Sequence, residues 1–403
     1  MNPLRHQIPV RSPLSLPALL VGMRAALSRN GAHEHAAARV EALHRARYAP
    51  RSVLLTESGT AALTAALMGL QRSSALQVVA IPAYACWDIA TAVEGAGARA
   101  LLYDIDPHTL APDVAQIDIA LRQGATAVVV AHLYGCPVDL DEIDRLATAA
   151  GAVVIEDAAQ GAGAMMHDRP VGMRGSLGVF SFGRGKGLTG GSGGALLAFD
   201  ERGSEALERA RARLGTPRRG WGELGTLAAQ LVFERPTLYA FPASLPFLHL
   251  GETIYRDPRT LRASPTVSCA VVAATWKLAD GEAETRRANA DRLRPELRYH
   301  PGFLPIEPLP HARPGYLRLP AVASPRARLA VTARAARRLG IMPGYPQALC
   351  DVDRVRRFSL NGDESFPGSR LLAARLCTFP THSRLAAGDL RRLTRWIREA
   401  ASS

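Results

Sequence analysis

Two stretches decide the fold: residues 153–164 read V-V-I-E-D-A-A-Q-G-A-G-A, and residues 180–197 read F-S-F-G-R-G-K-G-L-T-G-G-S-G-G-A-L-L. The first begins as an apolar run typical of a buried strand and continues into two carboxylates and small residues. The second is a glycine-rich loop that leads into a further apolar strand, predicted at Ala195–Phe199. Loops at strand ends are where open α/β sheets bind their ligands, so we expect the functional site here.

Asp157 ends the first of these strands, beside Glu156. A carboxylate in a partly dry site needs a cationic partner, and the protonated nitrogen of a pyridine ring would serve. The carboxylate would in turn keep such a ring protonated, so that the ring can withdraw electrons. The same position also suits an N-cap on the following Ala/Gln turn. From the strand end alone, both interpretations stay open.

Lys186 is isolated in the glycine-rich loop, and the only other lysine of the chain is Lys277. A partly desolvated lysine has a lowered pKa, which favours Schiff-base chemistry. Ser181 and its neighbours offer hydroxyl and N–H donors to a phosphate, and the loop glycines let the backbone pass close to a ligand. A solvated turn lysine is the alternative. A P-loop is excluded because Gly187 stands where Ser or Thr is required.

Two more strand-end loops hold candidate ligand contacts. Residues 56–63 read T-E-S-G-T-A-A-L, so a helix begins directly after a strand, and its free N–H groups could bind an anion. Ordinary capping by Ser58 or Thr60 explains this stretch equally well, and both roles use the same donors. Residues 81–89 read I-P-A-Y-A-C-W-D-I, where Tyr84 or Trp87 could stack on a planar cofactor or simply pack in the core.

Short apolar runs and helical patterns alternate through the first half of the chain. Strands are predicted at Val53–Leu55, Val78–Ile81, Ala100–Tyr103, Ala127–Val130 and Val153–Ile155, and helices at Thr60–Leu70, Trp87–Ala96 and Asp139–Ala150. Fully apolar strands that alternate with helices predict an α/β fold, with a mostly parallel central sheet flanked by helices.

The second half has different patterns. Helices are predicted at Glu201–Gly220, which is rich in arginine, at Val267–Leu293 and at Ala387–Ala400. We expect an N-terminal arm at residues 1–45, a large domain at 46–260, and a long helix with a smaller C-terminal α+β domain at 261–403. The apolar segment 225–250 is broken by prolines. It either packs against the rest of the protein or forms an exposed patch for a partner or a membrane surface.

Composition narrows the function classes. The chain is 47% hydrophobic and 21% charged, as in ordinary globular proteins, and no apolar run is long enough to span a membrane. The formal charge is +13, but the arginines are spread along the chain, so nucleic-acid binding is not expected. Five scattered cysteines without CxxC spacing argue against disulfides and metal sites, and they favour the cytoplasm. The N-terminus does not resemble a signal peptide.

Together these segments resemble the DegT/DnrJ/StrS family of pyridoxal phosphate-dependent sugar aminotransferases. The similarity runs nearly end to end, and the pair E-D-A-A-Q (156–160) and F-S-F-G-R-G-K (180–186) is its specific part. The resemblance implies a type I aminotransferase fold and a homodimer with active sites at the subunit interface. It also implies amino transfer from an amino acid, usually glutamate, to a keto-sugar that is commonly nucleotide-linked, in polysaccharide or secondary-metabolite biosynthesis.

The resemblance assigns residue roles as well. Lys186 matches the lysine that forms a Schiff base with the cofactor and acts as acid/base, and Asp157 matches the partner of the pyridine nitrogen. Gln160 matches the residue that contacts the cofactor's ring face or hydroxyl. The residues that match the phosphate cradle are Gly59, Thr60 and Ser181.

Three features depart from the family pattern. Cys86 stands where most members have the stacking aromatic, so Trp87 beside it is the candidate for that contact. The stretch that usually lends an asparagine to the neighbouring subunit reads D-P-R-T-L-R-A-S, with Thr260 near the asparagine position. The apolar segment 225–250 is not typical of the family.

Two alternative functions stay open at this point. One is another reaction on the same cofactor, such as an elimination, dehydration or oxidative step. The other is a non-catalytic, cofactor-binding regulatory protein that uses residues 225–250 as its contact surface.

Overall fold

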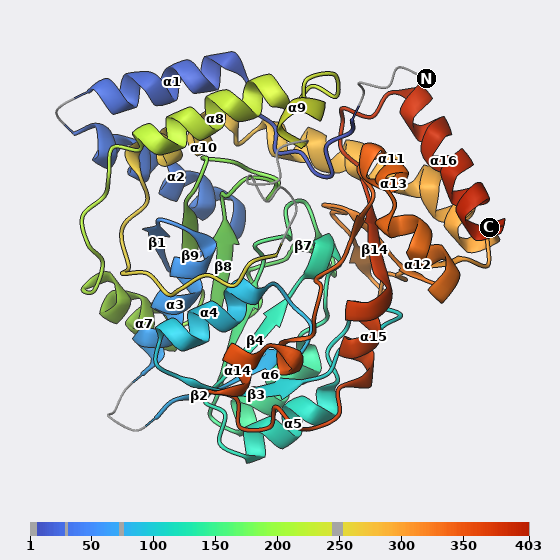
Figure 1. The fold of residues 1–403 in the computed structure, drawn as a ribbon. Helices are drawn as coiled ribbons and strands as arrows, with labels where there is room; N and C mark the ends of the chain where they lie inside the picture. The colour runs from blue at the N-terminus through green and yellow to red at the C-terminus, as the bar shows by residue number, and fades with distance from the viewer. Residues whose placement is uncertain (1–5, 29–30, 72–75, 244–252, 403) are drawn as a thin grey trace.

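The computed structural model describes residues 6–28, 31–71, 76–243 and 253–402. Its centre is a seven-stranded sheet in the order β1-β9-β8-β5-β4-β2-β3 (Figure 1). In that order the strands are Ser52–Thr56, Gly194–Ala198, Leu177–Ser181, Val153–Asp157, Ala127–Ala131, Val78–Pro82 and Arg99–Tyr103. Strand β9 runs antiparallel to both neighbours, and all other pairs are parallel. The predicted mostly parallel sheet is therefore confirmed.

Helices cover both faces of this sheet. Side chains alternate between the faces of a strand, so Leu54 of β1 belongs to one core cluster whereas Val53 and Leu55 belong to another. The cluster around Leu54 includes α3 (Gly59–Leu70), α4 (Trp87–Gly95) and α7 (Glu201–Arg211), and the other includes α2 (Ala32–Tyr48) and α10 (Thr266–Thr275). The connecting helices α5 (Val114–Arg122) and α6 (Asp141–Ala149) pack on β3 and β5 respectively.

One strand and the ends of one helix differ from the sequence prediction. Strand β8, which ends at Ser181, was not predicted. The helix predicted at Glu201–Gly220 ends as α7 at Arg211. Beyond it the chain is extended, because Gly215 exchanges backbone hydrogen bonds with Leu261 and Ala263, and Pro217 cannot continue a helix.

The long helix predicted at Val267–Leu293 is two helices, α10 and α11 (Leu278–Tyr299). They are separated at Trp276 and Lys277. The ring of Trp276 packs edge-on against His44 of α2, with a centroid distance of 4.7 Å, so the chain is fixed to the large sheet at the break. Helix α11 then runs away from that sheet toward the C-terminal part (Figure 1).

The C-terminal part has its own sheet and core, as predicted. Its four strands, all antiparallel to their neighbours, follow the order β10-β12-β14-β13. They are Phe303–Pro305, Leu319–Ala323, Leu376–Phe379 and Met342–Pro343. The helices that contribute to this core are α12 (Pro325–Thr332), α13 (Arg334–Arg338) and α16 (Ala387–Ser402). The later helices α14 (Asp353–Arg356) and α15 (Pro367–Arg375) bury Val355 and Leu372 in the core of the large sheet. Helix α16 confirms the predicted terminal helix. A small sheet of β11 (Ala312–Arg313), β6 (Met165–Met166) and β7 (Arg169–Pro170) joins the two parts.

The apolar segment predicted at residues 225–250 is described only as far as residue 243. It contains most of α8 (Trp221–Phe233) and α9 (Ala240–Ala243). Leu227 is fully buried, but Val232 and Phe241 are exposed, so the segment packs on the protein with one side only. Within the described ranges, no helix combines the length and apolar character needed to cross a membrane.

Candidate active site

A pocket opens at the carboxyl ends of β1, β2, β4, β5 and β8, where the parallel arrangement places the strand-end loops side by side. All but one of the predicted site residues line it: Gly59, Thr60, Asp157, Gln160, Ser181 and Lys186. They come from the loops after β1, β5 and β8, which are far apart in sequence. The other lining residues are Leu63, Cys86, Asp88, Ile89, Ala131, His132, Leu133 and Ala159.

Trp87 is the exception, because it does not line the pocket. Its indole packs against the large core and lies beside Tyr255, with ring centroids 6.4 Å apart. Helix α4 begins at this residue, and its neighbours Cys86 and Asp88 line the pocket instead. Burial raises the pKa of the Cys86 thiol to about 12, so the group that this loop offers is a neutral thiol.

The start of α3 forms an anion cradle with Ser181. Ser58 caps the helix by accepting from the N–H of Ala61, and the first N–H groups, those of Gly59 and Thr60, have no intrahelical acceptor. A Cβ on Gly59 would stand 2.8 Å from Ser181 Cβ and 3.1 Å from its Oγ. Glycine therefore lets the N-terminus of α3 approach the Ser181 hydroxyl closely, an arrangement suited to binding a phosphate.

The loop that holds Lys186 is fixed by tight contacts on both sides of the lysine. Gly185 and Gly187 have positive φ angles of 76° and 84°, which few other residues adopt. A Cβ on Gly187 would lie 2.2 Å from Ala162 Cβ, so the loop is pressed against the segment after β5. Ser12 Oγ accepts from the N–H groups of Gly185 (3.0 Å) and Lys186 (3.1 Å). The N-terminal segment thus anchors the lysine loop over the pocket.

Asp157 lines the pocket as a half-buried carboxyl group. Burial raises its pKa, and the hydrogen bond from the N–H of Ala159 (2.9 Å) and the charge of Lys186 only partly offset this effect. Of the two roles considered from the sequence, the structure shows the cap on the following turn, and the role as partner of a pyridine nitrogen stays a prediction.

Gln160 is held by two hydrogen bonds. Its Oε1 accepts from the N–H of Tyr134 (2.8 Å), and its Nε2 donates to the hydroxyl of Tyr345 (2.6 Å). Tyr345 comes from the C-terminal part and stacks on Tyr134 at 5.7 Å, while its N–H donates to the hydroxyl of Tyr84. These tyrosines join the C-terminal part to the wall of the pocket.

A buried hydrogen bond between His132 and Glu156 supports the wall next to Asp157. The N–H of Val138 donates to His132 Nδ1 (3.1 Å), so Nε2 carries the hydrogen and donates to Glu156 Oε1 (2.7 Å). Burial would raise the pKa of Glu156, but the bonds from His132 and from the N–H of Arg174 (2.8 Å) lower it below its usual range. Glu156 is thus a satisfied carboxylate that fixes the orientation of His132.

Sequence reasoning missed several of these residues. His132, Tyr134 and Tyr345 lie in segments that carry the family resemblance, H-L-Y-G and P-G-Y-P, yet no local pattern links them to one another. A strand-end position was the available signal for His132. Ser12 lies in the resembling segment Q-I-P-V-R-S-P (7–13), but no pattern linked it to the lysine loop 174 residues away.

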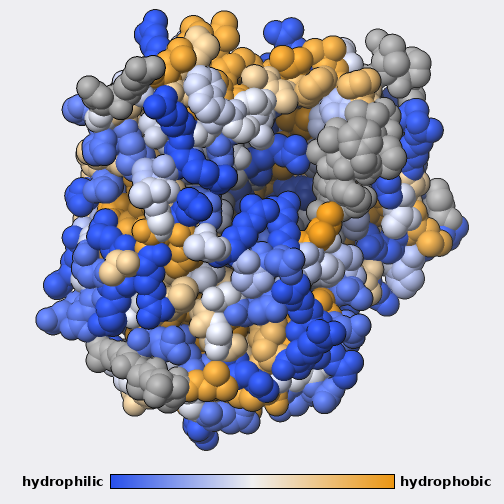
Figure 2. Space-filling model, turned by 60° about the vertical axis from the view of Figure 1, so that its left-hand side comes forward, coloured by the Kyte–Doolittle hydropathy of each residue, from blue (hydrophilic) through white to orange (hydrophobic). Residues whose placement is uncertain are grey.

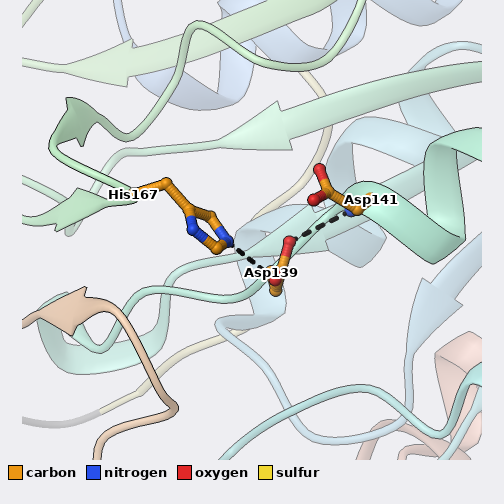
Figure 3. A group of neighbouring side chains, drawn as sticks. All are labelled: Asp139, Asp141 and His167. Carbon is orange, nitrogen blue, oxygen red and sulfur yellow. Dashed lines mark hydrogen bonds and ion pairs between the residues drawn. The ribbon is translucent and has the colours of Figure 1, made fainter.

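A cluster of two carboxylates and a histidine outside the pocket has the spacing of a metal site, but an arginine pairs with its carboxylates. Asp139, Asp141 and His167 lie together on the surface, and Figure 3 shows His167 pointing toward Asp139. The Nε2 of His167 is 3.0 Å from Asp139, and the Arg174 guanidinium pairs with Asp139 and Asp141. A protein cation therefore already balances these carboxylates.

Pyridoxal phosphate, the cofactor that the resemblance implies, fits this pocket on two observations. The cradle that a Cβ on Gly59 would fill is suited to a phosphate. The half-buried Asp157 needs the cation that a protonated pyridine nitrogen provides. Lys186 lines the same pocket as both, so its amine is the group available to bind a carbonyl carbon.

Comparisons with known proteins agree with this geometry. Residues 32–226 match the model of the DegT/DnrJ/EryC1/StrS aminotransferase family. The chain is 38% identical over 157 residues to an L-glutamine:2-deoxy-scyllo-inosose aminotransferase of Micromonospora echinospora, a match that covers 39% of this chain and 37% of that protein. It is 37% identical over 144 residues to a UDP-N-acetyl-3-dehydro-alpha-D-glucosamine 3-aminotransferase of Acidithiobacillus ferrooxidans, covering 36% and 39% respectively. The matches thus span well under half of these relatives.

The similarity of fold extends further than that of sequence. The aminotransferase TlmJ from Streptoalloteichus hindustanus superposes with a TM-score of 0.76 at 21% identity, over 98% of this chain and 99% of that one. Both the large sheet and the C-terminal part therefore share the fold of this enzyme. The matching segment contains all seven strands of the large sheet and every predicted site residue. Residues 32–226 therefore resemble the DegT/DnrJ/EryC1/StrS aminotransferase family, and the whole chain shares the fold of a solved aminotransferase.

Proposed function

We propose that this chain is a pyridoxal phosphate-dependent aminotransferase that moves an amino group from an amino acid to a ketone on a polyhydroxylated ring. Relatives are named for glutamine as donor and for an inosose or a UDP-linked keto-sugar as acceptor, so these compounds are the first candidates. Glutamate, the donor expected from the resemblance, is tested beside glutamine.

One observation carries the proposal. A lysine, a half-buried carboxyl group that needs a cation, and a helix N-terminus with a serine hydroxyl meet in one pocket. These are the three contacts that this cofactor requires, at its carbonyl, its ring nitrogen and its phosphate. A structural lysine in a turn would have no reason to share a pocket with the other two.

The residues divide the work as follows. When bound, the cofactor supplies a carbonyl that condenses with amines and a ring that withdraws electrons. Lys186 Nζ would hold the cofactor at its carbonyl carbon, and the free amine would move the proton of the donor's α carbon as general base and acid. Asp157 keeps the ring nitrogen protonated. The phosphate would be held by Gly59, Thr60 and Ser181. Gln160 would contact the face or the hydroxyl of the cofactor ring.

Arg318 is our candidate for binding an anionic group of the substrate. It precedes β12, and its Nε is buried without a hydrogen-bond partner among the described residues. Burial lowers its pKa, and the side chains that oppose this effect are Tyr134, Tyr345 and Tyr239 rather than carboxylates. Two of these tyrosines form the wall around Gln160. A half-buried arginine beside these tyrosines, with a buried unpaired Nε, suits the carboxylate of an amino donor.

We also propose a homodimer with the active sites near the subunit interface. Thr260, at the position where family members supply an asparagine to the neighbouring subunit, is exposed in this chain. That exposure supports a contact with a second copy, although threonine offers a hydroxyl in place of the amide.

The proposal is tested with the purified holoprotein, glutamate or glutamine, and a panel of inososes and nucleotide-linked keto-sugars analysed by mass spectrometry. We expect one acceptor to gain an amino group together with stoichiometric formation of the donor's keto acid. Lys186→Ala should abolish this, whereas Lys277→Ala removes the other, exposed lysine and should retain it. A chain that binds the cofactor but forms no keto acid from any donor would refute aminotransferase activity.

A further inference from the structure

Helix α1 (Leu16–Leu27) buries its small residues and exposes most of its large apolar ones. Its buried positions are the small residues Ala18, Gly22 and Ala26, and a Cβ on Gly22 would stand 2.7 Å from Val271 of α10. The helix therefore lies very close to α10. Of its six large apolar residues, Leu19 packs against the core, and the other five are exposed: Leu16, Leu20, Val21, Met23 and Leu27. An ordinary surface helix buries its large residues and exposes polar ones, so this one lacks a covering layer.

Helix α8 lies beside α1 and has the same character (Figure 1). Leu227 is its only fully buried side chain, whereas Trp221 is 51% exposed. Val232, Leu238 and Phe241 continue the exposed apolar surface toward α9. Of the 17 large hydrophobic residues exposed in the described part of the chain, nine belong to α1 and residues 221–241. We call this surface the α1–α8 face, and Figure 2 shows apolar side chains gathered along this edge of the molecule.

The exposed charges on the α1–α8 face are basic. Within α1 and residues 221–241 they are Arg24 and Arg235, and the exposed Arg219 precedes α8. Arg218 beside it is paired with Glu57 and Glu223, so it adds no net charge to the face. The acidic residues of these segments are taken up by the protein: Glu234 is buried and paired with Arg11 and Arg384, and the partly buried Glu223 hydrogen-bonds Ser192. The face therefore combines apolar side chains, an exposed tryptophan and a positive rim.

We propose that the α1–α8 face docks the protein on the surface of an anionic lipid bilayer. Two apolar helices that lie side by side can enter the boundary between headgroups and acyl chains without crossing it. Tryptophan favours that boundary, and guanidinium groups attract anionic headgroups. The complementary charge favours lipid over a second copy of the chain, because a symmetric contact would set this positive face against itself.

The experiment is sedimentation of the holoprotein with vesicles of phosphatidylcholine alone and with vesicles of phosphatidylcholine and phosphatidylglycerol in equal parts. We expect binding to the mixed vesicles that weakens as salt is added. Leu27 and Trp221 are exposed in the free protein, and the proposal places both side chains in the bilayer. Leu27→Glu and Trp221→Glu should therefore each weaken vesicle binding on the order of ten-fold or more, because each removes one apolar side chain that the bilayer would bury. Arg24→Gln should reduce the preference for the anionic vesicles.

Leu329→Glu is the matched control, since Leu329 is 74% exposed on α12, away from the α1–α8 face. This variant should bind vesicles as the unchanged chain does. Equal binding of Leu27→Glu and Leu329→Glu, or no binding to either vesicle, overturns the proposal. Analytical ultracentrifugation tests whether a second copy of the chain binds this face instead of lipid. If Leu27→Glu dissociates a dimer that Leu329→Glu leaves intact, the face joins two copies of the chain and the lipid proposal is wrong.

Discussion

Substitution of Gly59 by alanine tests the cradle most sharply. The added methyl group would meet Ser181 Cβ at 2.8 Å and its Oγ at 3.1 Å. Because the first contact is shorter than real Cβ contacts, the start of α3 must move away from the end of β8. Overpacking of this kind costs about 1–3 kcal/mol. Since the shift separates the helical N–H groups from the serine hydroxyl, we expect affinity for the cofactor to fall on the order of ten- to a hundred-fold.

The assay has two parts. Absorbance titration of the cofactor-free protein measures affinity, and denaturant unfolding of the same protein measures stability. In a background of Ser181→Gly the clash partner is gone, so Gly59→Ala should cost less stability there than in the unchanged chain. Gly281→Ala in α11 is the control, because a Cβ there meets nothing within 4 Å and alanine favours a helix. If Gly59→Ala leaves affinity unchanged, or if its cost is the same in both backgrounds, the close approach of Gly59 to Ser181 does not form the cradle.

Three further predictions concern charged side chains. Asp157 has a raised pKa, so its ionisation destabilises the cofactor-free fold as pH rises. The melting temperature of Asp157→Asn should therefore exceed that of the unchanged chain at neutral pH, and the difference should vanish in acid. The same variant should bind the cofactor more weakly. Glu156 has a lowered pKa, so its contribution to the free energy of unfolding is present at neutral pH and is lost as pH falls through that pKa. Denaturant unfolding should show that Glu156→Gln lowers the free energy of unfolding by about 2–3 kcal/mol at neutral pH and by less in acid. Arg318→Gln should raise the donor concentration needed for half-saturation on the order of ten-fold or more without changing cofactor binding, and an unchanged donor requirement would remove Arg318 from the substrate site.

Much of the large sheet could be predicted because its strands are uniformly apolar and its helices are periodic. The five residues of β4, for example, are all buried. Strand β8 escaped prediction because Gly178 interrupts its apolar pattern. That glycine is required by packing, since a Cβ there would stand 2.1 Å from the carbonyl oxygen of Gly172. Glycine is required at position 178 by a contact with a distant segment, and such a contact leaves no local sequence pattern.

The pocket was predictable where its residues sit at strand ends in sequence order. Asp157 follows that rule, and so do Gly59 and Thr60 at the start of α3. Ser181 was predicted from the glycine-rich loop and the resemblance instead, since its strand β8 was not predicted. Trp87 illustrates the limit, because the first turn of a helix places adjacent side chains in different directions, and here the neighbours of Trp87 line the pocket. Contacts from distant segments, such as Tyr345 on Gln160, required the structure.

Reductive trapping of the bound coenzyme examines the central assignment directly. The holoprotein is treated with borohydride, digested and mapped by mass spectrometry. Our account predicts one peptide that carries a phosphopyridoxyl group, attached at residue 186 and absent from the Lys186→Ala variant. A label at Lys277 alone, or no labelled peptide when the coenzyme is in excess, would contradict it.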